Sequence, residues 1–276
     1  MKKQKAVCIL ALAIFTAMPA AGETAEVYMR HRIRIDAFRL MGKEIPEQVV
    51  IQKTWVGRYR IRSDNSAQSV LLLLDRKMLY FIDHREKSYA AVRIDLDRIV
   101  KETALFRYPD RGKKEKGAGE QKEMIRSVTV KKTGDLKVIR GWKCEKYILT
   151  ADTGMGIVKS EIWATSDIPF KYGRYGLYSA ALISVMPGKS FPVEEAVREI
   201  EKIRNISPVM RRNMARAGKA ARLVRGVPVY TETGLRVMDS EMRTSRELLE
   251  FRRGNAPGGT FSVPAGYTRK KIPGKN

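Results

Sequence analysis

The sequence predicts an α+β protein, in which an antiparallel sheet carries helices packed on one side. Short segments of alternating apolar and polar residues follow one another about every eight to ten residues, which is typical of antiparallel strands joined by tight turns. Two other regions, 95–106 and 188–223, space their apolar residues at the helical period. The two periods together indicate a sheet with added helices rather than a helical bundle.

The chain begins with the features of a secretory signal peptide. Three lysines precede an apolar run over residues 6–18, and small residues follow it. We expect cleavage after Gly22, which leaves residues 23–276 as a single exported domain in the periplasm. A membrane anchor would need a longer apolar run. After cleavage Cys144 is the one remaining cysteine, so we expect no internal disulfide and a buried thiol. The alternative is a reactive or intermolecularly paired cysteine.

The chain is strongly basic. Its 276 residues carry a formal charge of +24, and loss of the three leader lysines reduces this to +21. In the cytosol such a charge would suggest nucleic-acid binding, but export argues against it. The anionic partners expected outside the cytoplasm are membrane head groups, lipopolysaccharide phosphates and acidic proteins.

Alternation predicts the strands of the first half. Residues 27–36 place His31 among apolar side chains on one face and arginines on the other. Arginines also alternate over 58–62. The continuous apolar run 71–74 indicates a strand covered on both faces. The strands expected here are 27–36, 49–56, 58–62, 70–75, 78–83 and 88–92.

The second half is expected to resume with strands after a helix over 95–106 and a basic, glycine-rich solvent loop at about 109–124. A hairpin of 143–150 and 156–165 follows the strand 125–132. Trp163 is expected to meet a cross-strand aromatic residue such as Tyr147. The last predicted strands are 227–233, 235–238 and 243–251.

A helical insertion is expected at about 191–223, with a second helix restarting at Pro208. This second helix combines a thin stripe of Met and Ala with strongly basic flanks. Two interpretations remain: the helix packs on the sheet, or it binds a membrane surface.

No catalytic, cofactor or metal signature is present. The two histidines, His31 and His84, suit satisfied core or surface positions, and one mature cysteine cannot build a Cys/His zinc set. The nucleophile-elbow, phosphate-loop and dinucleotide motifs are all missing. We therefore expect no enzymatic activity, no cofactor and no bound metal.

Several short motifs nevertheless form an ordered series. They are Met78-Leu-Tyr80 with Ile82-Asp83 and Tyr89, Gly141-Trp-Lys-Cys144-Glu-Lys-Tyr147, Ser160-Glu-Ile-Trp163, Gly226-Val-Pro-Val229 and Phe261-Ser-Val-Pro264-Ala-Gly266-Tyr267. In these motifs the chain resembles the exported domain-of-unknown-function family 4412. That family in turn is similar to half-barrel proteins of the Gram-negative periplasm, such as the lipoprotein carrier LolA and the sensor RseB. The resemblance implies a curved antiparallel sheet whose apolar concavity holds acyl chains.

The function expected is that of a periplasmic, non-catalytic binding protein or chaperone for an acyl-bearing ligand, either a lipid or a lipoprotein. The residues expected to line its apolar cavity are Leu72, Leu74, Tyr80, Ile82, Tyr147 and Trp163. The alternative is that these residues belong to an ordinary core.

A second hypothesis is an envelope sensor or protein-interaction module that uses a basic surface. The anion-binding residues of that surface would be Arg30, Arg32, Arg34, Arg58, Arg60 and Arg62. Arginine suits phosphate because it can donate two parallel hydrogen bonds. Alternatively the arginines are solvated, or are neutralised by acids such as Asp75, Asp83 and Glu161.

Overall fold

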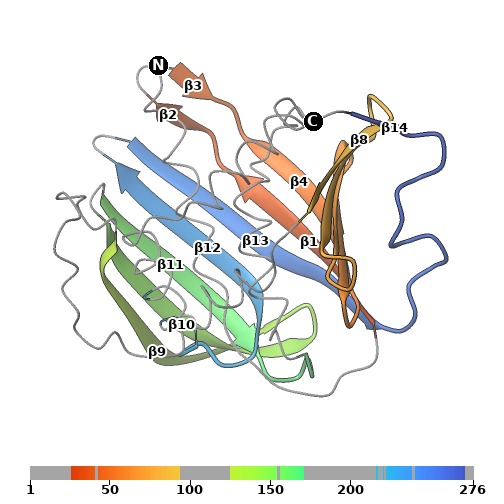
Figure 1. Ribbon diagram of the computed structural model, residues 1–276. Coiled ribbons are helices and arrows are strands. Elements are labelled where there is room, and N and C mark those ends of the chain that lie inside the picture. The colour runs from red at the N-terminus through yellow and green to blue at the C-terminus, as the bar shows by residue number, and fades with distance from the viewer. Residues whose placement is uncertain are drawn as a thin grey trace, which may run out of the picture.

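The computed structural model describes residues 26–40, 43–93, 125–153, 156–170, 216, 220, 222–237 and 240–270. Twelve strands form one sheet in the order β14-β8-β7-β6-β5-β4-β1-β13-β12-β11-β10-β9, and β2 and β3 form a separate hairpin. Neighbouring strands are antiparallel except β14 and β8, which are parallel. Figure 1 shows β9–β13 broadside and β8 nearly on edge, so the sheet is strongly curved.

The strands of the first half are β1 (Val27–Ile35), β2 (Phe38–Leu40), β3 (Lys43–Ile45), β4 (Gln48–Val56), β5 (Arg60–Asp64), β6 (Gln68–Leu73), β7 (Met78–Asp83) and β8 (Ser88–Arg93). Those of the second half are β9 (Ile125–Ile139), β10 (Trp142–Thr153), β11 (Gly156–Thr165), β12 (Val227–Val237), β13 (Ser240–Arg253) and β14 (Thr268–Arg269). Within the described ranges the predicted strands are therefore found, with shifts at their ends, except that 227–233 and 235–238 form the single strand β12.

The predicted α+β class is wrong. The described residues are nearly all strand, and Arg216 and Ala220 are the helical ones among them. The sheet is larger than expected because β9, β12 and β13 continue through polar residues whose backbones bond to a neighbour. Gly234, which suggested a break, instead pairs with Arg243 inside the β12–β13 ladder.

Several expectations fall on residues that the structure does not describe. They are the leader 1–22, the helix 95–106, the basic loop at about 109–124 and most of the insertion at about 191–223. Ala220, at the end of that insertion, is buried against apolar residues of β10 and β11. This contact agrees with a segment packed on the sheet at that position. Within the described residues no helix is long and apolar enough to cross a membrane.

The register of the β10–β11 hairpin corrects one prediction. Tyr147 lies opposite Ile162, and Trp163 lies opposite Lys146. Adjacent residues of a strand point to opposite faces, so Tyr147 and Trp163 are on different sides of the sheet and cannot form the expected aromatic pair. The ammonium of Lys146 lies 5.4 Å from the centroid of the Trp163 ring instead.

Cys144 is buried in β10, as expected, and burial raises the pKa of its thiol above the ordinary value. The thiol form therefore predominates at neutral pH, which disfavours reactivity.

Both faces of β6 and β7 are covered. Leu72 and Leu79 belong to the largest apolar cluster, which also includes residues of β1, β5, β8 and β10–β13. Leu71 and Ile82 point the other way and pack in a smaller cluster with Phe261. The prediction of a strand covered on both faces is thus confirmed. We call the face carrying Leu71 the outer face; through the strand register it also carries Tyr28, Trp55, Arg62 and Tyr80.

The cover of the outer face comes from residues 254–270, which we call the C-terminal segment. After β13 the segment returns over β5–β8 (blue trace in Figure 1) and ends in β14 beside β8. Phe261, Val263 and Tyr267 pack against the Leu71 cluster. The terminal motif that suggested the family resemblance is therefore a docking motif for this face.

Candidate functional site

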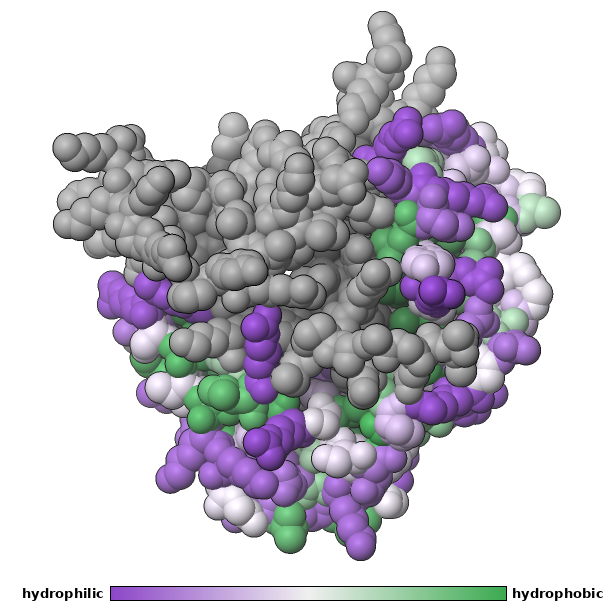
Figure 2. All heavy atoms as spheres, turned by 60° about the horizontal axis from the view of Figure 1, so that its bottom comes forward, coloured by the Kyte–Doolittle hydropathy of each residue, from purple (hydrophilic) through white to green (hydrophobic). Residues whose placement is uncertain are grey.

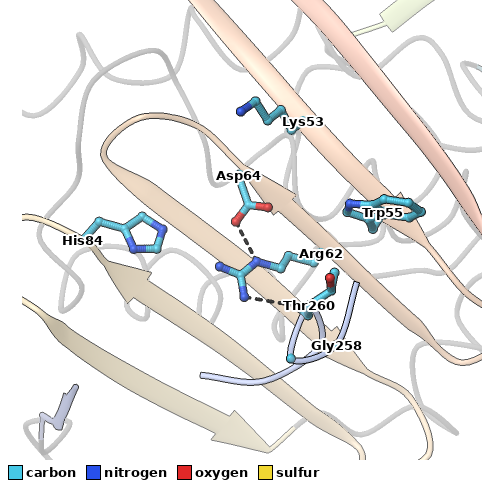
Figure 3. A pocket seen from close by; sticks show the side chains of 8 residues that line it. Lys53, Trp55, Arg62, Asp64, His84, Gly258 and Thr260 are labelled. Carbon is cyan, nitrogen blue, oxygen red and sulfur yellow. Dashed lines mark hydrogen bonds and ion pairs between the residues drawn. The ribbon is translucent and has the colours of Figure 1, made fainter. Parts of the chain in front are cut away.

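A pocket of about 440 Å³ lies where the C-terminal segment meets β4 and β5 (Figure 3). Its lining residues are Lys53, Trp55, Arg62, Asp64, His84, Gly258, Gly259 and Thr260. Register explains the grouping: Trp55 lies opposite Arg62, and Lys53 lies opposite Asp64, so the four side chains share the outer face.

Arg62 binds the C-terminal segment to β5. One of its terminal nitrogens donates to the carbonyl oxygens of Thr260, at 3.1 Å, and Ser262, at 3.0 Å. Its Nε donates to Asp64 Oδ1 at 2.7 Å, and its other terminal nitrogen donates to Ser69 Oγ at 3.0 Å. Only 12% of this side chain is exposed. Its hydrogen-bonding capacity is therefore largely used within the protein.

Ser69, His84 and Tyr267 form a hydrogen-bonded chain beside Arg62. The Ser69 hydroxyl donates to Asp64 and lies 2.5 Å from His84 Nε2, while His84 Nδ1 lies 3.0 Å from the Tyr267 hydroxyl. Since the Ser69 proton goes to Asp64, His84 Nε2 is the donor to Ser69. In the neutral imidazole Nδ1 then accepts from the Tyr267 hydroxyl, whereas a protonated Nδ1 would donate to it.

The electrostatics favour the neutral imidazole. Burial, followed by the charge of Arg62, lowers the pKa of His84 below its ordinary value, and the carboxylates of Asp64 and Asp83 oppose this shift.

The residue types Ser69, His84 and Asp64 do not form a catalytic triad. In a triad the carboxylate accepts a hydrogen bond from the histidine, whereas here Asp64 accepts from Ser69, and Tyr267 occupies the second nitrogen of His84. Ser69 is 1% exposed, and its oxygen is occupied by three partners. The chain of hydrogen bonds holds the C-terminal segment in place rather than activating a nucleophile.

Lys53 differs from the other cation of the pocket. Arg62 is balanced by Asp64, but no carboxylate pairs with the Lys53 ammonium within the described residues. Lys53 and Trp55 lie on the pocket wall contributed by β4 (Figure 3). The Trp55 ring is held by Tyr28, with ring centroids 5.0 Å apart. The pocket therefore offers one available positive charge beside an ordered aromatic surface.

The backbone of Gly258 and Gly259 forms the opposite wall. Gly259 has a φ of +78°, which glycine adopts without strain, and a Cβ on Gly258 would meet nothing within 4 Å. This turn leaves room for a ligand between the C-terminal segment and β4.

The predicted arginines of β1 lie on the outer face, but each has an acidic partner. Arg30 pairs with Glu250 at 3.3 Å and Arg32 pairs with Glu247 at 3.5 Å. Arg34 pairs with Asp36, at 3.0 Å, and with Glu47, at 2.5 Å. Neutralisation thus occurs, although not through Asp75, Asp83 or Glu161.

The predicted arginines near β5 are separated by their partners. The Arg58 guanidinium lies 5.0 Å from the ring centroid of Tyr59. Arg60 lies 4.4 Å from the ring centroid of Phe261 and pairs with Glu26. Of the six predicted arginines, Arg62 is the one that lines the pocket.

The six predicted cavity residues do not converge. Leu72, Leu74 and Trp163 belong to the largest cluster, Tyr147 to the cluster of β10–β12, and Tyr80 and Ile82 to the outer-face cluster. Tyr80 pairs with Leu71, so it faces away from Leu72.

Sequence reasoning missed Lys53, Trp55, Asp64 and Ser69 as pocket or network residues. His84 was expected to be a satisfied core or surface histidine, and both of its ring nitrogens are hydrogen-bonded. The motif ending in Tyr267 was the available signal, because its spaced aromatic and apolar residues required a surface to cover.

No curated protein matches this chain. The model of a domain of unknown function, DUF4412, matches residues 57–180, from the turn before β5 to beyond β11. Two of the motifs behind the predicted resemblance, Gly226-Val-Pro-Val229 and Phe261–Tyr267, lie beyond the matched residues, whereas the others lie within them. The family predicted from those motifs is therefore confirmed over residues 57–180, which match the DUF4412 model.

Proposed function

We propose that this protein is an exported, non-catalytic binding protein for an acyl-bearing ligand, a lipid or a lipoprotein, and that its pocket holds the acidic head group of that ligand. The observation that carries the proposal is the position of Lys53. Its ammonium has no carboxylate partner among the described residues, while the arginines around it are paired. A ligand carboxylate or phosphate would supply the missing negative charge.

The acyl chain has an apolar path on the same strand. Ile51 and Val49 precede Lys53 by two and four residues, so their side chains share its face of β4. Both are among the exposed large hydrophobic residues, at 40% and 54%. Alternate residues of a strand are about 7 Å apart, so a chain of several methylene groups reaches both from the pocket.

The non-catalytic part of the proposal has its own support. Ser69 is buried and fully bonded, and both ring nitrogens of His84 are hydrogen-bonded. A binding role asks only for the charge and the apolar surface that the pocket supplies.

The alternative, an envelope sensor or interaction module acting through its arginines, draws less support. Arg30, Arg32 and Arg34 are each paired with a carboxylate, which reduces the positive charge that they offer a partner.

The first test is mass spectrometry of an organic extract of the natively purified protein, which should contain a stoichiometric acyl compound. The second is titration calorimetry of the delipidated protein with palmitate. Lys53→Gln should weaken palmitate binding about tenfold, the loss expected for a charge-assisted hydrogen bond. Lys159→Gln, an exposed lysine on β11, is the matched control and should bind as the wild type.

Two results would contradict the proposal. If no acyl compound co-purifies and palmitate does not bind, the protein does not bind acyl-bearing ligands. If Lys53→Gln and Lys159→Gln bind palmitate with equal affinity, the pocket is not the site that binds the head group.

A further inference from the structure

We propose that the end of the β9–β10 hairpin docks on an anionic lipid surface. This inference is independent of the pocket and of its ligand. The described large hydrophobic residues with the highest exposure are Leu136 at 76%, Val138 at 63% and Leu223 at 58%. Two of the three therefore lie within three residues of one another on β9.

The hairpin holds these side chains rigidly. Ile139 pairs with Trp142 across the two-residue turn Arg140-Gly141, in which both φ angles are positive, at 49° and 86°. Two such residues are typical of the tight turn that matches the twist of an antiparallel hairpin. The exposed side chains are therefore carried on an ordered element.

The two faces of the hairpin end have different environments. Ile139, Trp142 and Cys144 lie on one face and pack in the largest cluster. Leu136 and Val138 lie on the other face, opposite Glu145 and Lys143. One face is thus anchored in the core, and the other presents apolar side chains to solvent.

Leu223 lies at the same end of the sheet. Val224, the residue after Leu223, packs in the apolar cluster that contains Tyr147, and the Tyr147 hydroxyl donates to Glu145 Oε2 at 3.1 Å. Because Glu145 is opposite Leu136, the three apolar side chains border one region.

Cations surround the region. Lys132, Lys143 and Arg225 lie here with two carboxylates: Lys132 donates to Glu145 at 2.7 Å, and Asp167 accepts from the Lys143 backbone N–H at 3.0 Å. No carboxylate pairs with the Lys143 ammonium among the described residues. Apolar side chains that protrude can insert into a lipid interface, and the cations beside them are attracted to anionic head groups.

A lipid surface fits better than a protein partner. A stable protein interface buries about 800 Å² on each side with close shape complementarity. Figure 2 shows the lower side of the molecule, where hydrophobic groups are interspersed with hydrophilic ones rather than joined in one broad patch. Dispersed side chains can each insert among lipid chains, because a fluid surface needs no fixed complementary shape.

The test is co-sedimentation of the mature protein with vesicles. Vesicles of phosphatidylethanolamine and phosphatidylglycerol should bind it, phosphatidylcholine vesicles should bind it weakly, and added salt should release it. Leu136→Ser should lower the partition coefficient about fivefold. Lys143→Gln should lower it as well and should reduce the salt dependence.

The matched control is Ile157→Ser. Ile157 is also a large apolar residue, 51% exposed, but it lies on β11 opposite Asp152. This position is beside the β10–β11 turn, at the other end of β10 from the β9–β10 turn. The variant should bind vesicles as the wild type does. Equal binding of the wild type to both vesicle types, absence of binding, or equal losses for Leu136→Ser and Ile157→Ser would each overturn the proposal. Circular dichroism and thermal unfolding verify that the variants are folded.

Discussion

The Nδ1 atom of His84 is hydrogen-bonded to the Tyr267 hydroxyl at 3.0 Å, and in the neutral imidazole it is the acceptor, although 183 residues separate the two in sequence. The bond joins the turn after β7 to the C-terminal segment. This direction of the bond requires a neutral imidazole, because a protonated Nδ1 cannot accept. The state of His84 is therefore coupled to the attachment of the segment that walls the pocket.

Replacing Tyr267 by Phe should raise the pKa of His84 toward its ordinary value. The hydroxyl stabilises the neutral form, so its removal makes protonation easier. The variant should also lose about 1 kcal/mol of unfolding free energy. An NMR pH titration of the imidazole protons is practical because the chain has two histidines.

Tyr230→Phe is the control for that titration. The Tyr230 hydroxyl donates to Glu232 at 2.9 Å on β12, away from His84. The His84 titration should be unchanged in this variant. An unchanged titration in Tyr267→Phe as well would show that the hydroxyl does not set the His84 pKa.

The unfolding free energy should fall as pH decreases below about 6.5, the ordinary pKa of histidine. Burial lowers the pKa of both His31 and His84, so in this range the unfolded chain binds more protons than the folded one. The histidine contribution is present above the unfolded pKa and is lost as pH falls toward each folded pKa.

Denaturant unfolding at pH values between 7.5 and 5 measures this effect above the range in which carboxylates titrate. His31→Met should reduce the slope, because His31 is fully buried beside Arg246 and its pKa is lowered well below the ordinary value. Stability that does not change with pH over this interval would contradict the prediction.

Arg62→Met should destabilise the protein by about 3 kcal/mol, since it leaves the Asp64 carboxylate without its cation in a partly buried setting. It also removes the hydrogen bonds to the carbonyls of Thr260 and Ser262. Limited proteolysis should therefore cut the C-terminal segment faster than in the wild type.

Arg32→Met provides the comparison. Arg32 is on the same outer face and is also paired with a carboxylate, but 47% of its side chain is exposed. Its loss should cost less than about 1 kcal/mol and should leave the proteolysis rate unchanged. Similar losses in the two variants would mean that Arg62 does not hold the segment.

Gly226→Ala should cost about 3 kcal/mol or more. Gly226 has a φ of +90°, and an added Cβ would lie 2.2 Å from the Thr165 carbonyl oxygen, which is backbone and cannot rotate away. Gly234→Ala is the control, because its Cβ would meet only the flexible end of Glu241 at 3.6 Å. Thermal unfolding of the two variants should separate them clearly, and equal melting temperatures would refute the steric argument.

The sequence by itself determined the strands and the side that many of their residues face. Alternation placed Met29 and His31 on the buried side of β1 and the arginines on the other, and the bounds of β7 and β11 were predicted correctly. The ordered short motifs predicted the family whose model matches residues 57–180. These features are readable because side-chain direction within a strand depends only on local backbone geometry.

The tertiary structure decided how the strands combine. Register placed Tyr147 and Trp163 on opposite faces and distributed the six expected cavity residues among three clusters. It also joined the expected strands 227–233 and 235–238 into β12 through Gly234. The described residues are nearly all strand, not the expected α+β mixture. The pocket depends on Arg62 meeting Thr260 and His84 meeting Tyr267, residues that no local pattern connects. Such pairings follow from the summed packing of distant segments, whereas the periodicity of one segment reports only its own faces.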